Sequence, residues 1–452
     1  MRQKIPTTRA KLDFKIKRLG KCKFKSPLKL DTTVGNYVAN FVKDTDKIMY
    51  EPTLKKWRES ITNGEMPYFI EVAGPRHEIF FNPHKTKAAI VTCGGLCPGL
   101  NDVVRSIVME LWFHYDVKNI LGIRYGYWGL LPERRDSAIA LTPDMVANIH
   151  NLGGSFLGSS RGDQDVSKMT DFLAENEINI LFAIGGDGTQ TGALEIAKEL
   201  RRRKLKKAIV GIPKTIDNDI AYLDKTFGFE TAAAVARDVI LSGHIEAEGA
   251  LYGIGLVKLM GRHSGFIAAR AALAAGVANF VLVPEVPFDL DGRNGFLTAL
   301  EERLRLRKHA LIVIAEGAGQ DLLIDAAKRL GVDPSGNEKL ADIGLYLKDR
   351  ILDYFKTKTE LNVTLKYIDP SYTIRSAPAH AMDHVYCLKL GQNAVHSAMT
   401  GRTEMIVGSW NGYFTHIPIT TAISKRKVLN PEGDEWLAVV EATGQPLVMK
   451  NN

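Results

Sequence analysis

From about residue 86 onward, the chain repeats one pattern: a short apolar run, a glycine-rich turn, and then an amphipathic stretch. The apolar runs are continuous rather than alternating, which is typical of strands in a parallel sheet that is covered on both faces. These runs lie at residues 87–92, 178–184, 206–212, 253–259, 278–283 and 309–316. The pattern predicts an α/β protein with two Rossmann-like three-layer α/β/α domains, largely parallel sheets and an N-terminal extension.

The same pattern divides the chain into segments. We expect an extension over residues 1–85, a first α/β domain over 86–228, and a second α/β domain over 229–375. A later segment, about 376–410, is expected to return to the first domain. Residues 411–452 are less regular and form a C-terminal segment. The glycine-rich turns follow the ends of the strands, where open parallel sheets form their binding crevice.

The net charge of +8 is concentrated at the start of the chain, where residues 1–30 contain 11 Lys and Arg and one acidic residue, Asp13. Since the rest is close to neutral, a nucleic-acid partner is not expected, and the basic arm is expected to lie in solvent or between subunits. The sequence contains no run of 18 or more apolar residues, so a membrane span is not expected. Neither a secretory leader nor a C-terminal peroxisomal signal is recognisable, so we expect a cytoplasmic protein.

Two glycine-rich loops, at 94–101 and 185–192, each lead from a strand into a helix. Such a turn presents backbone N–H groups at the positive end of the helix, which suits a phosphate. Neither loop has the Walker or the dinucleotide spacing, and a glycine turn can also serve tight packing alone. Asp187 within "GGDGTQ" favours a ligand, because a carboxylate beside a polyphosphate needs an intervening cation, for which Mg²⁺ is the natural candidate.

The loop "PKTIDND" places two carboxylates, Asp217 and Asp219, directly after a strand. One can take a proton from an attacking hydroxyl while the other tunes it or contacts Mg²⁺. The alternative is a turn in which these side chains only cap the backbone. Lys214, in the same loop, suits a phosphate contact.

Further polar residues sit in loops that suit anions and sugar hydroxyls. Arg161 follows small residues, Arg262 lies in a strand-to-helix turn, and Glu316 ends an apolar run. The stretch 366–375 adds a lysine, a tyrosine and an arginine. Together with the carboxylates and glycine loops, these residues indicate phosphoryl transfer, which depends on positioning and charge stabilisation.

Seven segments carry a resemblance to the phosphofructokinase family: "GGLCPGLN", "LGSSRGD", "IGGDGTQTGA", "PKTIDNDI", "VKLMGRHSGFIA", "PEVPF" and "IAEGAG". They occur in the family's order, and the resemblance extends over about residues 86–405. "KLMGR", "GGDGTQ" and "YIDPSY" resemble especially the long ATP-dependent branch of plants and trypanosomatids. The resemblance implies transfer of the γ-phosphoryl of Mg-ATP to the 1-hydroxyl of fructose 6-phosphate, in a homotetramer whose N-terminal extension wraps a neighbouring subunit.

The resemblance also implies individual roles. For catalysis it implies Asp217 as the general base, Asp219 as its partner carboxylate, the Thr215 hydroxyl at the transferred group, and Arg262 near the transition-state charge. Asp187 matches the Mg²⁺-associated carboxylate. The nucleotide-phosphate contacts are Gly95, Arg161, Gly188, Thr189 and Gly192, to which Lys214 is added. The sugar-phosphate contacts are Met260, Gly261, Arg262, Glu316, Lys366, Tyr372 and Arg375, together with Thr215 and Asp217.

Three positions depart from a simple match or bear on the donor. Gly253 stands where short bacterial members have an arginine that reaches the neighbouring subunit's sugar phosphate. Lys214 resembles pyrophosphate users, whereas Gly188 resembles ATP users. We predict ATP, because a side chain at position 188 would block the α-phosphate. The alternatives are a pyrophosphate-dependent enzyme and a non-catalytic regulatory subunit that binds sugar phosphates; the complete set of carboxylates argues against the latter.

Overall fold

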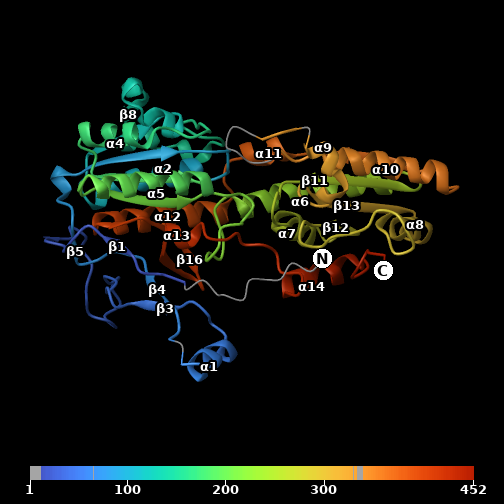
Figure 1. The fold of residues 1–452 in the computed structure, drawn as a ribbon, viewed down its shortest axis with the longest axis horizontal. Helices are drawn as coiled ribbons and strands as arrows, with labels where there is room; N and C mark the ends of the chain where they lie inside the picture. Colours follow the sequence, from blue (N-terminus) through green and yellow to red (C-terminus); the bar gives the residue numbers. More distant parts are fainter. Residues whose placement is uncertain (1–11, 65, 329, 333–338, 452) are drawn as a thin grey trace.

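The computed structural model describes residues 12–451 apart from 65, 329 and 333–338. Its two main sheets, of nine and four strands, lie one after the other along the long axis (Figure 1). The larger sheet has the order β3-β4-β17-β16-β10-β9-β6-β7-β8. Its five central strands are parallel: β16 (Met405–Trp410), β10 (Ala208–Pro213), β9 (Ile180–Gly185), β6 (Lys87–Thr92) and β7 (Asn119–Ile123). Antiparallel strands flank them: β8 (Ala138–Ala140) on one side, and β17 (Tyr413–Pro418), β4 (Phe69–Val72) and β3 (Lys47–Met49) on the other.

Helices cover both faces of the larger sheet. α2 (Leu100–Met109) and α12 (Ala381–Met399) pack on one face, and α4 (Val166–Glu175) and α5 (Asp187–Arg202) pack on the other. In β9, Ile180 and Phe182 contact the first pair of helices, whereas Leu181 and Ala183 contact the second pair. Every residue of this strand is buried, which explains why its sequence is continuously apolar.

The smaller sheet, of order β12-β13-β11-β14, is wholly parallel. Its strands are β12 (Phe280–Leu282), β13 (His309–Ala315), β11 (Gly253–Leu259) and β14 (Thr364–Ile368). On one face lie α6 (Phe229–Glu248) and α7 (Phe266–Ala275), and on the other α8 (Phe296–Arg307) and α10 (Ile343–Lys358). The predicted pair of three-layer α/β units with largely parallel sheets is therefore confirmed.

The two ends of the chain add to this frame. β17 extends the larger sheet beyond residue 410, where the sequence predicted a less regular segment. The chain then continues through α13 (Ile419–Ala422) to the smaller sheet, where α14 (Asp434–Thr443) packs against α7. At the other end, β1 (Lys17–Arg18) pairs with β15 (Arg402–Thr403), and Phe14 packs against Tyr50 and Tyr222. The described part of the basic arm thus lies on its own chain.

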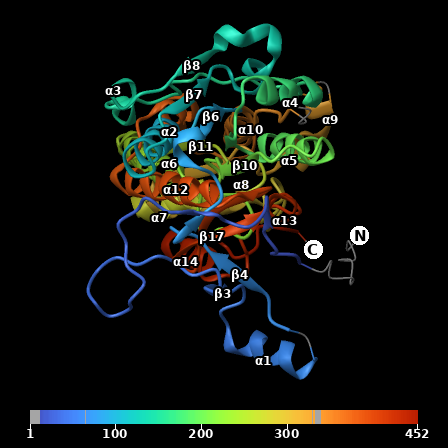
Figure 2. The same ribbon diagram turned by 90° about the vertical axis from the view of Figure 1, so that its left-hand side faces the viewer.

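The remaining elements are short. They are β2 (Phe24–Lys25), which pairs with β5 (Glu78–Ile79), and the helices α1 (Leu54–Thr62), α3 (Pro143–Val146), α9 (Ile324–Lys328) and α11 (Ser371–Ser376). α1 buries no residue and stands away from the two sheets (Figure 2). Within the described part of the chain, no helix combines the length and the apolar character needed to cross a membrane.

Candidate active site

The carboxyl ends of strands from both sheets meet at one place. The loop after β10 in the larger sheet is joined to the loop after β11 in the smaller sheet, since the Ser264 hydroxyl donates to the backbone carbonyl of Asp217 at 2.9 Å. The loop after β13 joins them, because the Gly317 amide donates to the carbonyl of Gly261 at 3.1 Å. The structure therefore brings three of the predicted loops, which lie far apart in the sequence, into one site.

Asp217 lies at the centre of this meeting point. Its Oδ1 atom is buried and has no hydrogen-bond partner among the described residues. Burial and the nearby carboxylates of Asp219 and Glu316 together raise the pKa of this carboxyl to about 7, although Arg375 and a backbone hydrogen bond from Arg262 act in the opposite direction. A carboxylate with this pKa can accept a proton near neutral pH, which is what a general base requires.

The Asp217 loop is also a turn, as the alternative interpretation expected. The Thr215 hydroxyl accepts a hydrogen bond from the amide of Asp217 at 3.2 Å and donates one to Asp219 Oδ1 at 2.7 Å. Asn218, between the two aspartates, has the left-handed backbone angle φ of 57°. The turn gives the two carboxylates different partners: Asp219 is held by its neighbours, and Asp217 keeps a free oxygen.

Arg426 connects Asp219 to Asp187, the first residue of α5. Its guanidinium lies 2.7 Å from Asp219 Oδ2 through Nη1 and 2.9 Å from Asp187 Oδ2 through Nη2. The pKa of Asp187 lies above its ordinary value, because burial and the charge of Asp219 raise it more than the charge of Arg426 lowers it. The two carboxylates carry more negative charge than the single guanidinium neutralises. The remaining negative charge suits a divalent cation.

Sequence reasoning missed Arg426. It lies in the C-terminal segment, more than 200 residues from both carboxylates, and its only local signal is the cationic run "KRK" at 425–427. The segment is fixed in place because the Lys427 amide donates to the backbone carbonyl of Asp219 at 2.8 Å. Local sequence patterns do not reveal such a contact, because the contact depends on how the C-terminal segment folds back onto the larger sheet.

Three predicted phosphate-binding residues lie together at the loop after β6. The Lys214 ammonium is buried and donates to the carbonyl of Gly95 at 2.7 Å. A Cβ atom added to Gly95 would lie 3.4 Å from Arg161 Nη2. Burial lowers the pKa of Lys214, and the charges of Arg375 and Arg161 lower it as well. These cations form the electropositive side of the site.

The residues predicted to contact the nucleotide phosphates at the start of α5 differ in their surroundings. A Cβ atom added to Gly188 would meet no atom of the described residues within 4 Å, so their packing does not require glycine there. A Cβ atom at Gly192 would lie 2.7 Å from the Tyr127 ring. The Thr189 side chain is buried against Gly185. Gly192 and Thr189 therefore have a structural role whether or not they contact a ligand, whereas Gly188 faces open space.

Only some of the residues predicted to bind the sugar phosphate lie beside the meeting point of the two sheets. Arg375 Nε donates to Met260 Sδ at 3.1 Å, which places it beside the loop of Gly261. Tyr372 is one turn earlier on α11 and is 86% exposed. Lys366 is exposed in the middle of β14, opposite Gly255, rather than at the strand end. In the described chain, Tyr372 and Lys366 have no side-chain contact with the carboxylates.

Gly253 has a packing reason for lacking a side chain. A Cβ atom there would lie 2.1 Å from the backbone carbonyl of Ala247, in the last turn of α6. An arginine therefore does not fit this position unless the end of α6 moves. The close approach of α6 thus gives a packing reason for the glycine that stands in place of the subunit-bridging arginine.

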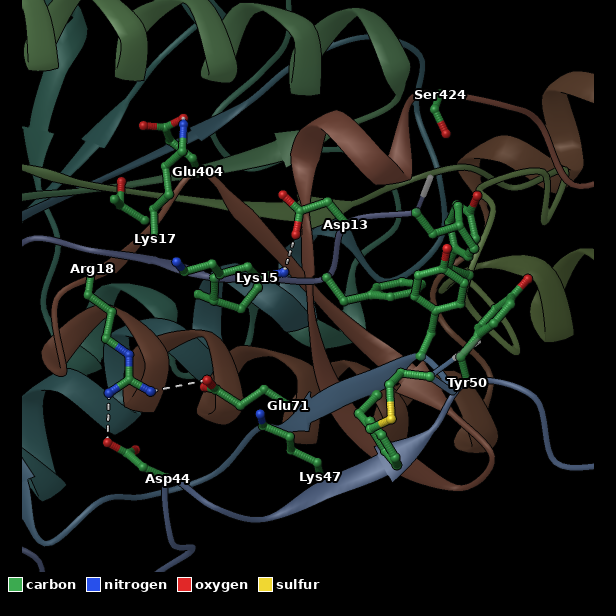
Figure 3. A pocket seen from close by; sticks show the side chains of 18 of the residues that line it. Asp13, Lys15, Lys17, Arg18, Asp44, Lys47, Tyr50, Glu71, Glu404 and Ser424 are labelled. Carbon is green, nitrogen blue, oxygen red and sulfur yellow. Dashed lines mark hydrogen bonds and ion pairs between the residues drawn. The ribbon is translucent and has the colours of Figure 1, made fainter. Parts of the chain in front are cut away.

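A large hollow of about 2150 Å³ lies elsewhere, between the N-terminal extension and the larger sheet (Figure 3). None of the residues predicted for the site lines it. Arg18 at its edge pairs with Asp44 at 2.7 Å and with Glu71 at 3.1 Å. The carboxylates and cations of the candidate active site lie at the strand ends, outside this hollow.

The two-sheet fold and the charges at its strand ends suit the transfer of a phosphoryl group. The family described as "Phosphofructokinase" matches residues 87–398. The chain is 50% identical over 446 residues to the ATP-dependent 6-phosphofructokinase of Borreliella burgdorferi, covering 97% of this chain and 98% of that protein. It is 43% identical to the enzyme of that name from Trypanosoma cruzi, covering 95% and 87%. The chain belongs to the phosphofructokinase family.

Among solved structures, the pyrophosphate-dependent phosphofructokinase of Marinobacter aquaeolei matches with a TM-score of 0.65 at 20% identity, covering 81% of this chain and 92% of that one. A Pichia pastoris phosphofructokinase in the T-state matches with a TM-score of 0.62, also at 20% identity, covering 90% of this chain and 39% of the other. At this identity the likeness concerns the fold alone.

Proposed function

We propose that this chain is an ATP-dependent 6-phosphofructokinase, which transfers the γ-phosphoryl group of ATP to the 1-hydroxyl of fructose 6-phosphate and releases fructose 1,6-bisphosphate and ADP. The observation that carries this proposal is Asp217, whose pKa of about 7 and free oxygen suit a general base at the meeting point of the two sheets. Residues 86–228 with the return segment bind the nucleotide, and residues 229–375 bind the sugar phosphate.

In this mechanism Asp217 accepts the proton of the attacking sugar hydroxyl. The negative charge of Asp219 helps to raise the pKa of Asp217. Asp219 also accepts a hydrogen bond from the Thr215 hydroxyl and so holds it near the transferred group. Arg262 and Arg375 stabilise negative charge on the transferring phosphoryl and on the sugar phosphate. Glu316 accepts hydrogen bonds from sugar hydroxyls, and Lys214 with Arg161 faces the nucleotide phosphates.

The residues at the start of α5 fit a magnesium ion. Asp187 and Asp219 offer carboxylate oxygens, the ligands that Mg²⁺ prefers, and they already share one cationic group in Arg426. Asp187 would hold the ion, with Asp219 beside it. When bound, Mg²⁺ neutralises charge on the donor's phosphates and makes transfer easier. Arg426 has to share its two carboxylates with the ion or move toward the phosphates.

The donor assay tests the proposed function. Purified protein is supplied with fructose 6-phosphate and Mg²⁺, together with either ATP or pyrophosphate, and fructose 1,6-bisphosphate is measured. We expect turnover with ATP, because Gly188 leaves room for the α-phosphate that only the nucleotide carries. We expect little or no turnover with pyrophosphate, because relatives that match nearly the whole chain are named ATP-dependent. Turnover with pyrophosphate alone contradicts the ATP assignment, and turnover with neither donor supports the non-catalytic alternative.

The pKa of Asp217 predicts an acid limb in the activity profile. A base must be deprotonated to act, so kcat/KM is expected to fall as the pH drops through about 7, by roughly tenfold per unit well below that pH. Measuring kcat/KM for fructose 6-phosphate between pH 5.5 and about 8.5 checks this. A profile that stays flat to the acid end removes Asp217 from the role of base.

We also propose a homotetramer in the cytoplasm. The exposed α1 and the basic N-terminal extension offer surface for contact with a neighbouring subunit. Light scattering on the eluted protein should give four times the mass of one chain, and removing residues 1–50 should reduce that mass. An unchanged tetramer after this deletion contradicts a role for the extension in assembly.

Cell fractionation tests the proposed cytoplasmic location.

A further inference from the structure

A cluster of two histidines and one glutamate lies outside the site described above. His244 and Glu248 are one turn apart at the end of α6, and His309 is the first residue of β13. Their ligand atoms all lie within 4.8 Å of one another. The Nε2 atoms of His244 and His309 lie 3.5 Å and 3.8 Å from Glu248 Oε1.

These separations are close to those of a tetrahedral metal site. Zn²⁺ binds histidine nitrogen and carboxylate oxygen at about 2.0–2.2 Å, so neighbouring tetrahedral ligands lie roughly 3.3–3.5 Å apart. Residues four apart on a helix share one face, which aligns His244 with Glu248. The third ligand is held by the sheet, since His309 is opposite Gly253 in the register of β11 and β13. Only small side-chain movements separate the cluster from a three-ligand site.

The surroundings of His309 and Glu248 also favour a metal. The backbone of Arg307 lies within hydrogen-bonding reach of the His309 ring, and an outer contact of this kind is typical of metal-binding histidines. His244 differs, because its Nδ1 atom is buried and has no partner within the described chain. Glu248 is half exposed, which leaves a path from solvent to the cluster. One coordination position remains for water.

The cluster is far from the carboxylates of the candidate active site. His309 begins β13 and Glu316 follows its end, so the two are separated by about seven residues, or roughly 23 Å of strand. α6 begins at Phe229, close after the loop of Asp217 and Asp219, and it ends at the cluster. An ion there does not touch the transferred group, but it ties the far end of α6 to the smaller sheet.

We propose that His244, Glu248 and His309 form a binding site for a divalent transition-metal ion of the zinc type. Imidazole nitrogens select such ions over Mg²⁺, which prefers oxygen ligands, so this site and the magnesium site have different occupants. The bound ion stabilises the folded chain by joining the end of α6 to the start of β13.

Titration of the full chain with Co²⁺ in excess Mg²⁺ tests the proposal, because Mg²⁺ saturates oxygen-ligand sites and tetrahedral Co²⁺ absorbs visible light. We expect one Co²⁺ per chain, with no thiolate charge-transfer band. Glu248→Gln and His309→Gln should each weaken binding by at least ~10–100-fold. The matched control is His84→Gln, because exposed His84 also faces a carboxylate, that of Asp116 at 3.4 Å, and its substitution should leave binding unchanged.

The thermal midpoint gives a second readout. Zn²⁺ should raise the unfolding temperature of the wild type and of His84→Gln but not that of Glu248→Gln, while all three unfold at similar temperatures in the presence of a chelator. The proposal is overturned if the wild type binds no Co²⁺ at ~100 µM, or if the variants bind as the wild type does. A thiolate band that accounts for all bound Co²⁺ also overturns it, since the ion then lies on a cysteine.

Discussion

Replacing Asp217 by serine is expected to lower kcat by a factor of ~10² to 10⁴, the usual effect of losing a general base. The Michaelis constants for ATP and fructose 6-phosphate should change by only a few-fold, because the phosphate contacts of Arg375, Arg161 and Lys214 remain. The loss should be specific to the chemical step, since the Oδ1 atom of Asp217 has no hydrogen-bond partner in the part of the chain that the structure describes. Steady-state kinetics with both substrates varied checks this.

The matched control for this variant is Asp238→Ser. Asp238 is an exposed aspartate on α6, and its carboxylate pairs with the adjacent Arg237 at 2.8 Å, so kcat should stay at the wild-type value. A second variant, Asp217→Asn, keeps the shape of the side chain and removes only its basicity. If Asp217→Asn retains wild-type turnover, the proton is taken by another group and the mechanism above is wrong.

Replacing Gly188 by aspartate is expected to lower kcat/KM for ATP by ~10² to 10³ without loss of folding. A Cβ atom at this position meets no atom within 4 Å among residues 12–451 as far as they are described, so the fold tolerates a side chain there. The new carboxylate would stand beside the negatively charged polyphosphate, and like charges placed together cost several kcal/mol. Activity at several ATP concentrations and a thermal unfolding curve measure the two effects separately.

Two alanine variants separate space from charge. Gly188→Ala should keep the fold and reduce the use of ATP less than Gly188→Asp does, because it adds bulk without charge. Gly192→Ala lies one turn further along α5 and should lose stability instead, since its Cβ would lie 2.7 Å from the Tyr127 ring. Undiminished use of ATP by Gly188→Asp would show that the nucleotide does not pass this position.

The strands and the loops that follow them could be predicted because their causes are local. A strand buried on both faces has to be apolar at every position, and the six predicted runs match β6, β9, β10, β11, β12 and β13 closely. Parallel strands place their following loops at one edge, so Asp187 and Asp217 could be assigned to a common crevice from the sequence. The hydrogen bonds that the Thr215 hydroxyl makes with the Asp217 amide and with the Asp219 carboxylate are likewise local, since they lie within five residues.

The sequence alone determined the two α/β units, the glycine loops and the carboxylates, because hydrophobic burial and turn geometry act between near neighbours. Only the tertiary structure decided which distant groups face one another. Arg426 reaches Asp187 and Asp219 from the C-terminal segment, and Glu316 and Arg375 come close enough to set the pKa of Asp217. Electrostatic effects and packing depend on distance in space, and the chain folds back on itself over hundreds of residues to create those distances.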